Sequence, residues 1–190
     1  MNRLLAVLAF FLVFISGTIP FPGGQIHSKE FLTPKEIEKI QLAQEIDARV
    51  KAYLEAADLR LKTARERFGG MESQEGAPLE FFTVEEMIEG YNRIIKSVML
   101  NLEDAYRNRS TDREKVRSAL TRLRDSSKSA ENALPVLKKL AEEKLDEKVW
   151  NQVNEAIEIA KGAFEGAESG LSELPQPSDR KKGKETSKRN

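Results

Sequence analysis

The sequence predicts an all-α protein, folded as an up-down-up-down four-helix bundle with long antiparallel helices. Ala, Glu, Leu, Lys and Arg make up about half of the 190 residues, a composition typical of long helices. Apolar residues recur every three or four positions through most of the chain, and no part of the mature chain alternates polar and apolar residues as a strand would. We therefore expect one helical domain over residues 33–174.

The first 17 residues are predicted to be a signal peptide. A single Arg3 precedes twelve unbroken apolar residues that end at Ile15. A membrane-spanning helix needs about 20 apolar residues, so we expect no stable span after cleavage near Gly17. The protein is then extracytoplasmic, either periplasmic or secreted. The alternative is an uncleaved N-terminal anchor, which would still place the body outside the cytoplasm.

Residues 18–32 are expected to form a Pro/Gly-rich linker, and three capping boxes follow it. In the first box, Thr33 can cap the backbone N–H of Glu36 while the Glu36 carboxylate reaches back to Thr33. Thr83 and Glu86 repeat this arrangement fifty residues later, and Thr111 and Glu114 form a third box. The sequences after the three boxes do not resemble one another, so the boxes mark helix starts rather than an internal repeat.

Apolar spacing and stop signals give four helices. Their expected bounds are 34–68, 84–108, 112–145 and 147–173. Pro135 falls inside the third helix, where the apolar register continues without a slip, so we expect a kink there rather than a break. The short connection around Arg109 predicts that the second and third helices are antiparallel neighbours. The fourth helix carries apolar residues at heptad spacing, namely Trp150, Val153, Ile157, Ala160, Phe164, Ala167, Leu171 and Leu174.

Composition argues against an enzyme and against a bound cofactor. The chain has no cysteine, which excludes disulfides, thiol nucleophiles and zinc–thiolate sites. Its one histidine, His27, lies in the linker, so neither a Ser-His pair nor the Glu-x-x-His motifs of di-iron bundles can form. Met87 and Met99 are more typical of core filling than of haem ligation. A metal or cofactor carrier remains a third hypothesis, because a carboxylate-only site is still conceivable.

Gly162, Gly166 and Gly170 form a row on one face of the last helix. The preferred interpretation is a close contact with a neighbouring helix, since each interior glycine costs up to roughly 1 kcal/mol and needs a packing reason. The alternative is an interaction face, either a groove or a surface for weak self-association.

The last residues, 175–190, are expected to be a disordered basic tail. They contain six Lys or Arg residues against two acidic ones. A cluster in this tail is a candidate contact with an anionic surface: Arg180, Lys181, Lys182 and Lys184. The rest of the mature chain is acidic, so we expect no binding to nucleic acid.

A short motif at the first helix start is similar to one in a known family. The residues Leu-Thr-Pro-Lys-Glu at 32–36 resemble the Leu-Thr-x-x-Gln that opens helices in small periplasmic stress chaperones of the Spy and CpxP type, with Glu36 in place of Gln. The resemblance implies a periplasmic binder of unfolded protein, which we keep as the alternative function. The principal hypothesis is an exported, non-enzymatic helical bundle that binds a protein partner of unknown identity.

Overall fold

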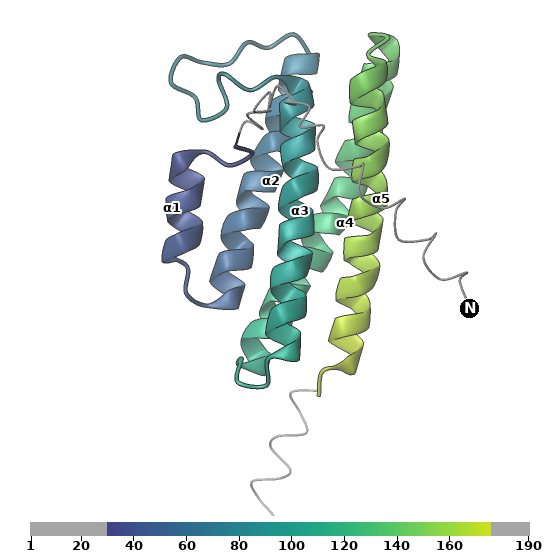
Figure 1. Cartoon of the computed structure of the whole chain (residues 1–190). Helices are drawn as coiled ribbons and strands as arrows, with labels where there is room; N and C mark the ends of the chain where they lie inside the picture. The colour runs from purple at the N-terminus through teal and green to yellow at the C-terminus, as the bar shows by residue number, and fades with distance from the viewer. Residues whose placement is uncertain (1–29, 176–190) are drawn as a thin grey trace, which may run out of the picture.

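The computed structural model describes residues 30–175, which form five helices and contain no strand (Figure 1). The all-helical prediction is confirmed, and the contacts between helices fit a helical bundle. The helices are α1 (Pro34–Leu42), α2 (Ile46–Phe68), α3 (Val84–Arg107), α4 (Arg113–Glu143) and α5 (Glu147–Glu173). None of these five is long and apolar enough to cross a membrane. The predicted signal peptide, most of the linker and nearly all of the basic tail lie outside the described residues.

The predicted single helix over 34–68 is wrong, because the chain turns back between α1 and α2. Ala43 and Glu45 both have extended backbone at this turn. Arg49 supports the turn, since its side chain donates hydrogen bonds to the carbonyl oxygens of Ala43, at 3.1 Å, and Gln44, at 3.4 Å. No Gly or Pro marks this position, so the helical period alone gave no sign of the break. The short α1 lies alongside α2 and runs antiparallel to it (Figure 1).

The four longer helices form two antiparallel hairpins, α2–α3 and α4–α5, that lie side by side. Helices that contact each other across the two hairpins run parallel. Lys115 of α4 meets Asp47 near the start of α2, and further along the same helices Ser126 donates a hydrogen bond to Asp58. On the other side of the bundle, α3 packs against α5.

The consecutive helices α3 and α4 lie diagonally across the bundle and contact each other only weakly, which corrects the expectation that they are neighbours. Residues 108–112 connect them. Five extended residues can span up to about 17 Å, whereas the diagonal of a bundle with helices 8–10 Å apart is about 13 Å. A short connection therefore does not force adjacency here.

The capping boxes at Thr33 and Thr83 form as predicted, and the predicted box at Thr111 is wrong, because Asp112 caps α4 by accepting from the Glu114 N–H at 2.9 Å. The backbone N–H of Thr33 donates to the Glu36 carboxylate at 2.7 Å, and Thr33 Oγ1 accepts from the Glu36 N–H at 3.3 Å. At the start of α3 the corresponding distances between Thr83 and Glu86 are 2.8 and 3.1 Å. These reciprocal bonds satisfy backbone donors that the first turn of a helix leaves free.

Pro135 lies inside α4, which continues past it to Glu143 as one helix. The helix then ends two residues earlier than expected, and Leu145 adopts a left-handed backbone with φ 54°. Its side chain is 91% exposed, although it falls within the helix expected over 112–145. Asp146 caps α5 by accepting from the Val149 N–H at 3.0 Å.

The core lies between the two hairpins, and α5 meets it with small residues. Of the large residues expected in the α5 seam, Trp150 and Ile157 lie at the edge of the core and are only partly buried, and Phe164 is also only partly buried. The residues of α5 that are buried are Val149, Val153, Ala156, Ala160, Ala163 and Ala167. The heptad spacing of the seam was therefore right, but its buried face is rotated toward the alanines.

Candidate functional site

The glycine row of α5 does not form the continuous close contact that the sequence favoured. A Cβ atom placed on Gly162 or on Gly166 would have no neighbouring atom within 4 Å. Only Gly170 approaches another helix, where an added Cβ would lie 3.1 Å from a methyl carbon of Leu120 in α4. The close-contact interpretation thus holds at one position of the three.

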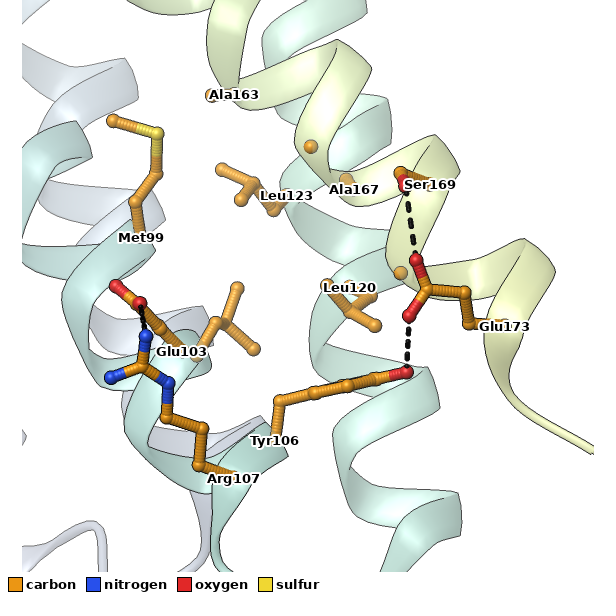
Figure 2. A pocket seen from close by; sticks show the side chains of 13 residues that line it. Met99, Glu103, Tyr106, Arg107, Leu120, Leu123, Ala163, Ala167, Ser169 and Glu173 are labelled. Carbon is orange, nitrogen blue, oxygen red and sulfur yellow. Dashed lines mark hydrogen bonds and ion pairs between the residues drawn. The ribbon is translucent and has the colours of Figure 1, made fainter.

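Next to Gly166 the surface is hollowed into a groove between α3 and α5, with a volume of about 340 Å³ (Figure 2). We call it the α3–α5 groove. Its floor is made by Leu120 and Leu123 of α4. The α3 wall is Met99, Leu102, Glu103, Tyr106 and Arg107, and the α5 wall is Ala163, Gly166, Ala167, Ser169, Gly170 and Glu173.

Small side chains on α5 explain why the groove exists. In the first half of the α3–α5 contact, polar side chains of α3 bridge the two helices. Lys96 pairs with Glu155 at 2.8 Å, and the Asn92 side-chain amide donates to the backbone carbonyl oxygen of Gln152 at 3.3 Å. In the second half, from Ala163 to Gly170, α5 presents only Gly, Ala and Ser to the groove, and these side chains are too short to fill the space. The parallel helices therefore leave a gap beyond their polar bridge.

A hydrogen bond between Tyr106 and Glu173 closes one end of the groove, near the C-termini of α3 and α5. The Tyr106 hydroxyl reaches across from α3 and donates to the Glu173 carboxylate at 2.8 Å, and Ser169 donates to the other oxygen of that carboxylate at 3.3 Å (Figure 2). Because the hydroxyl is hydrogen-bonded to a carboxylate, the pKa of Tyr106 is raised. Arg113 donates to the Tyr106 carbonyl oxygen at 2.8 Å, and Arg117 donates to the carbonyl oxygens that follow α5.

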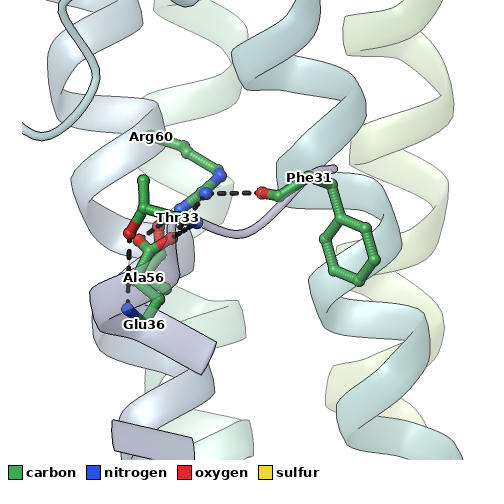
Figure 3. Close-up of polar contacts among 5 residues, drawn as sticks. All are labelled: Phe31, Thr33, Glu36, Ala56 and Arg60. Atoms are coloured by element: carbon green, nitrogen blue, oxygen red, sulfur yellow. Dashed lines mark hydrogen bonds and ion pairs between the residues drawn. The ribbon is translucent and has the colours of Figure 1, made fainter. Parts of the chain in front are cut away.

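At the opposite end of the bundle, the side chain of Arg60 is completely buried (Figure 3). Its guanidinium forms a two-pronged pair with the Glu36 carboxylate, at 2.7 and 2.8 Å. It also donates to the backbone carbonyl oxygens of Ala56, at 2.7 Å, and Phe31, at 2.5 Å. We call this arrangement the Arg60 clamp. It fastens α1 and the segment before it to α2.

The Arg60 clamp uses the same carboxylate that completes the first capping box. Burial of Glu36 opposes its ionisation, but hydrogen bonds from Arg60 and Thr33 together with the Arg60 charge outweigh burial, so the pKa of Glu36 is lowered. The Phe31 ring is also held, since the guanidinium of Arg93 in α3 lies 4.3 Å from its centre. Four hydrogen bonds engage both terminal nitrogens of the Arg60 guanidinium, and this geometry indicates a structural fastening.

Residues 30–175 contain no group of three or more acidic, histidine or cysteine side chains placed to hold a metal ion. The structure brings Gly166 and Gly170 together with Met99 in the groove, and leaves Gly162 on the exposed surface above it. Arg180, Lys181, Lys182 and Lys184 lie outside the described residues, so their candidate contact with an anionic surface stays a prediction.

The sequence interpretation missed Tyr106, Glu173 and Leu120 as groove residues, and it missed Arg60. Arg60 had a detectable signal, because it lies three positions after Ala57 and four before Ala64, and this spacing places the three residues on one helical face. The groove residues had none, because the diagonal placement of α3 and α4 decides which helices surround the gap. Comparison with protein families, curated proteins and solved structures found no significant match.

Proposed function

We propose that this protein is an exported, non-enzymatic binding module that takes up apolar side chains of a protein partner in the α3–α5 groove. The observation that carries the proposal is the groove itself: an apolar hollow, open to solvent, with a floor of two leucines and with a row of small residues along one wall. Helix grooves of this kind are a common means of peptide recognition.

In this proposal the helices α2–α5 act as a rigid four-helix scaffold, and the groove is the part that interacts. Glycines with no packing partner support this assignment. Gly162 and Gly166 weaken α5 by up to roughly 1 kcal/mol each relative to Ala, yet neither is needed for a close contact or a positive φ within the described chain. A requirement for open space beside α5 gives Gly166 a reason to be there.

The chaperone-like alternative predicts a broad exposed apolar surface. Of the large apolar side chains that are exposed, Leu42, Leu100 and Val136 are distributed along the helices. The others, Met71, Phe81 and Leu145, lie in the two connections at one end of the bundle. We favour recognition at the groove because it is a defined apolar hollow, whereas these exposed side chains line no comparable one. The carrier alternative has no supporting observation, since the groove is lined mainly by apolar groups and holds no cluster of metal-ligating side chains among the described residues.

The experiment that tests the proposal uses a groove-blocking variant. Gly166→Phe places a ring in the groove, whereas Ser129→Phe places the same ring on the exposed side of α4. Each purified protein, after a check that its thermal midpoint is close to that of the parent, serves as bait in an extract of the extracytoplasmic compartment. The proposal expects a partner that the parent and Ser129→Phe retain and that Gly166→Phe loses. Identical retention by all three proteins would contradict it.

A further inference from the structure

The dimensions of the α3–α5 groove match one face of a helix. The residues of α5 that line the groove run from Ala163 to Glu173, which corresponds to about 15 Å at 1.5 Å per residue. A partner helix with apolar residues at positions i, i+3 or i+4, and i+7 spans about 10 Å between its first and last anchors. The groove is therefore long enough for three apolar anchor residues, and the Tyr106–Glu173 hydrogen bond closes its end near the C-termini of α3 and α5.

The walls of the groove carry an excess of negative charge. From Glu155 to Glu173, α5 has five acidic residues and one lysine, Lys161, while the α3 wall between Lys96 and Arg107 has two of each sign. Helical spacing places Glu158 and Glu165 on the solvent-facing side of α5 next to the groove wall, and both are exposed. Neither forms an ion pair with another residue in the described part of the chain. Two acidic groups beside the groove are thus available to a partner.

The arginines near the groove have partners within the protein. Arg107 pairs with Glu103 at 2.5 Å on the α3 wall. Arg113 and Arg117 donate to neutral backbone carbonyl oxygens at the ends of α3 and α5, so their positive charges remain near the closed end of the groove. Away from that end the α5 side is acidic, since Glu158 and Glu165 outnumber Lys161 there.

We infer that the α3–α5 groove binds a basic amphipathic helix of a partner protein, with its apolar face on Leu120 and Leu123 and its Lys or Arg residues beside Glu158 and Glu165. This inference rests on the proposed function and adds the class of partner. The protein's own basic tail cannot replace such a helix, because residues 175–190 include no large apolar side chain. A second copy of the chain would bring its own acidic α5 toward the same acidic wall.

Two synthetic peptides of about 14 residues test the inference. Both carry leucine at i, i+3 and i+7 on a helix-forming alanine background. The first has lysine at the flanking positions, and the second has glutamate at those positions. Each is labelled with fluorescein, and binding to the full chain is measured by fluorescence anisotropy near 0.15 M salt, so that weak surface attraction is screened.

The lysine peptide is expected to bind the parent roughly tenfold more tightly than the glutamate peptide, since favourable rim charges are replaced by like charges. Gly166→Phe should abolish this binding and Ser129→Phe should leave it unchanged. The double variant Glu158→Lys/Glu165→Lys should remove or reverse the preference between the peptides. These three results together would establish both the site and its charge selectivity.

Other outcomes overturn the inference and say what is wrong. Equal affinity for both peptides, or a preference for the glutamate peptide, removes the basic character of the partner while the groove remains a binding site. Unchanged binding of the lysine peptide to Gly166→Phe shows attraction to the acidic surface alone. A parent protein that sediments as a dimer, and dissociates in Gly166→Phe, shows that a second copy is the occupant. Failure of both peptides to bind also rejects the inference, and the bait experiment then decides the proposed function separately.

Discussion

Two glycines inside helices, Gly90 in α3 and Gly166 in α5, have opposite surroundings. A Cβ on Gly90 would lie 2.8 Å from Nε and 3.1 Å from Cδ of Arg60, in the middle of a buried side chain that four hydrogen bonds hold in place. A Cβ on Gly166 would meet nothing within 4 Å. The first glycine makes room for a part of the protein itself, and the second leaves room that the described chain does not use.

The difference teaches that a glycine in a helix signals a need for space without saying what occupies the space. At Gly90 the occupant is the Arg60 clamp, which completes the fold. At Gly166 the space opens onto the α3–α5 groove, where we place a partner. Substitutions in the two regions should therefore change stability in opposite directions.

The largest effect is expected from Glu36→Gln in the Arg60 clamp. Glutamine can still complete the capping box, but it removes the charge that offsets a guanidinium with no exposed surface. Breaking a buried ion pair by removing one partner costs about 3–5 kcal/mol, and we expect a loss near the lower value because Glu36 is partly exposed. Chemical denaturation measures it. The control is Lys39→Ala, which breaks an exposed pair with Glu55 and should cost less than about 1 kcal/mol. Equal losses of unfolding free energy in the two variants would contradict the assignment of the Arg60 clamp as a buried ion pair.

Gly90→Ala comes next. The new methyl group must displace Arg60 from a position that its hydrogen bonds define, and overpacking of this kind costs about 1–3 kcal/mol. The free energy of unfolding should fall accordingly. In Glu36→Gln, where the Arg60 side chain is held less firmly, the same substitution should cost less, so a double-mutant cycle measures the coupling. A stabilised or unchanged Gly90→Ala would show that the region is not tightly packed.

The clamp also predicts a dependence of stability on pH. The pKa of Glu36 is lowered in the folded state from its ordinary value of about 4.5, so its stabilising contribution is full above that pH and is lost as the pH falls through the folded-state pKa. Burial raises the pKa of Asp58, which has the opposite effect as the pH falls. The comparison that isolates Glu36 is the parent against Glu36→Gln, and the stability difference between them should shrink below about pH 4.5. A constant difference would refute this.

The smallest effect is expected from Gly166→Ala, and its sign is reversed. Alanine favours a helix over glycine by up to roughly 1 kcal/mol, and nothing opposes the added methyl group. Gly162→Ala should behave in the same way. Gly170→Ala should gain less or lose stability, because its methyl group would lie 3.1 Å from Leu120. Thermal denaturation of the three variants gives the order, and a destabilised Gly166→Ala would show that α5 packs closely at that position.

Local signals in the sequence were enough for the starts of α1 and α3. Thr33 and Thr83 each combine a capping hydroxyl with a glutamate three residues later, and both boxes form because every bond in them lies within four consecutive residues. The class of fold and most of the buried apolar positions followed from periodicity in the same way.

What the sequence could not give depends on contacts between distant residues. The turn at Ala43 is supported by the Arg49 side chain rather than by Gly or Pro. Leu145 takes a left-handed conformation that its residue type does not predict. The groove requires the order of helices around the bundle. Local patterns leave open whether α3 faces α4 or α5, and the glycine row could therefore not be assigned to an open wall.

The availability of the groove in the folded protein can be measured directly, because the chain has no cysteine. A single Gly166→Cys thiol should react with a small maleimide nearly as fast as the exposed Gly162→Cys thiol, and far faster than Leu123→Cys in the groove floor, which is 2% exposed in the parent. The lysine peptide should protect Gly166→Cys and leave Gly162→Cys reactive. Slow labelling of Gly166→Cys in the free protein, comparable with Leu123→Cys, would mean that the groove is already covered and would contradict its role as an open binding site.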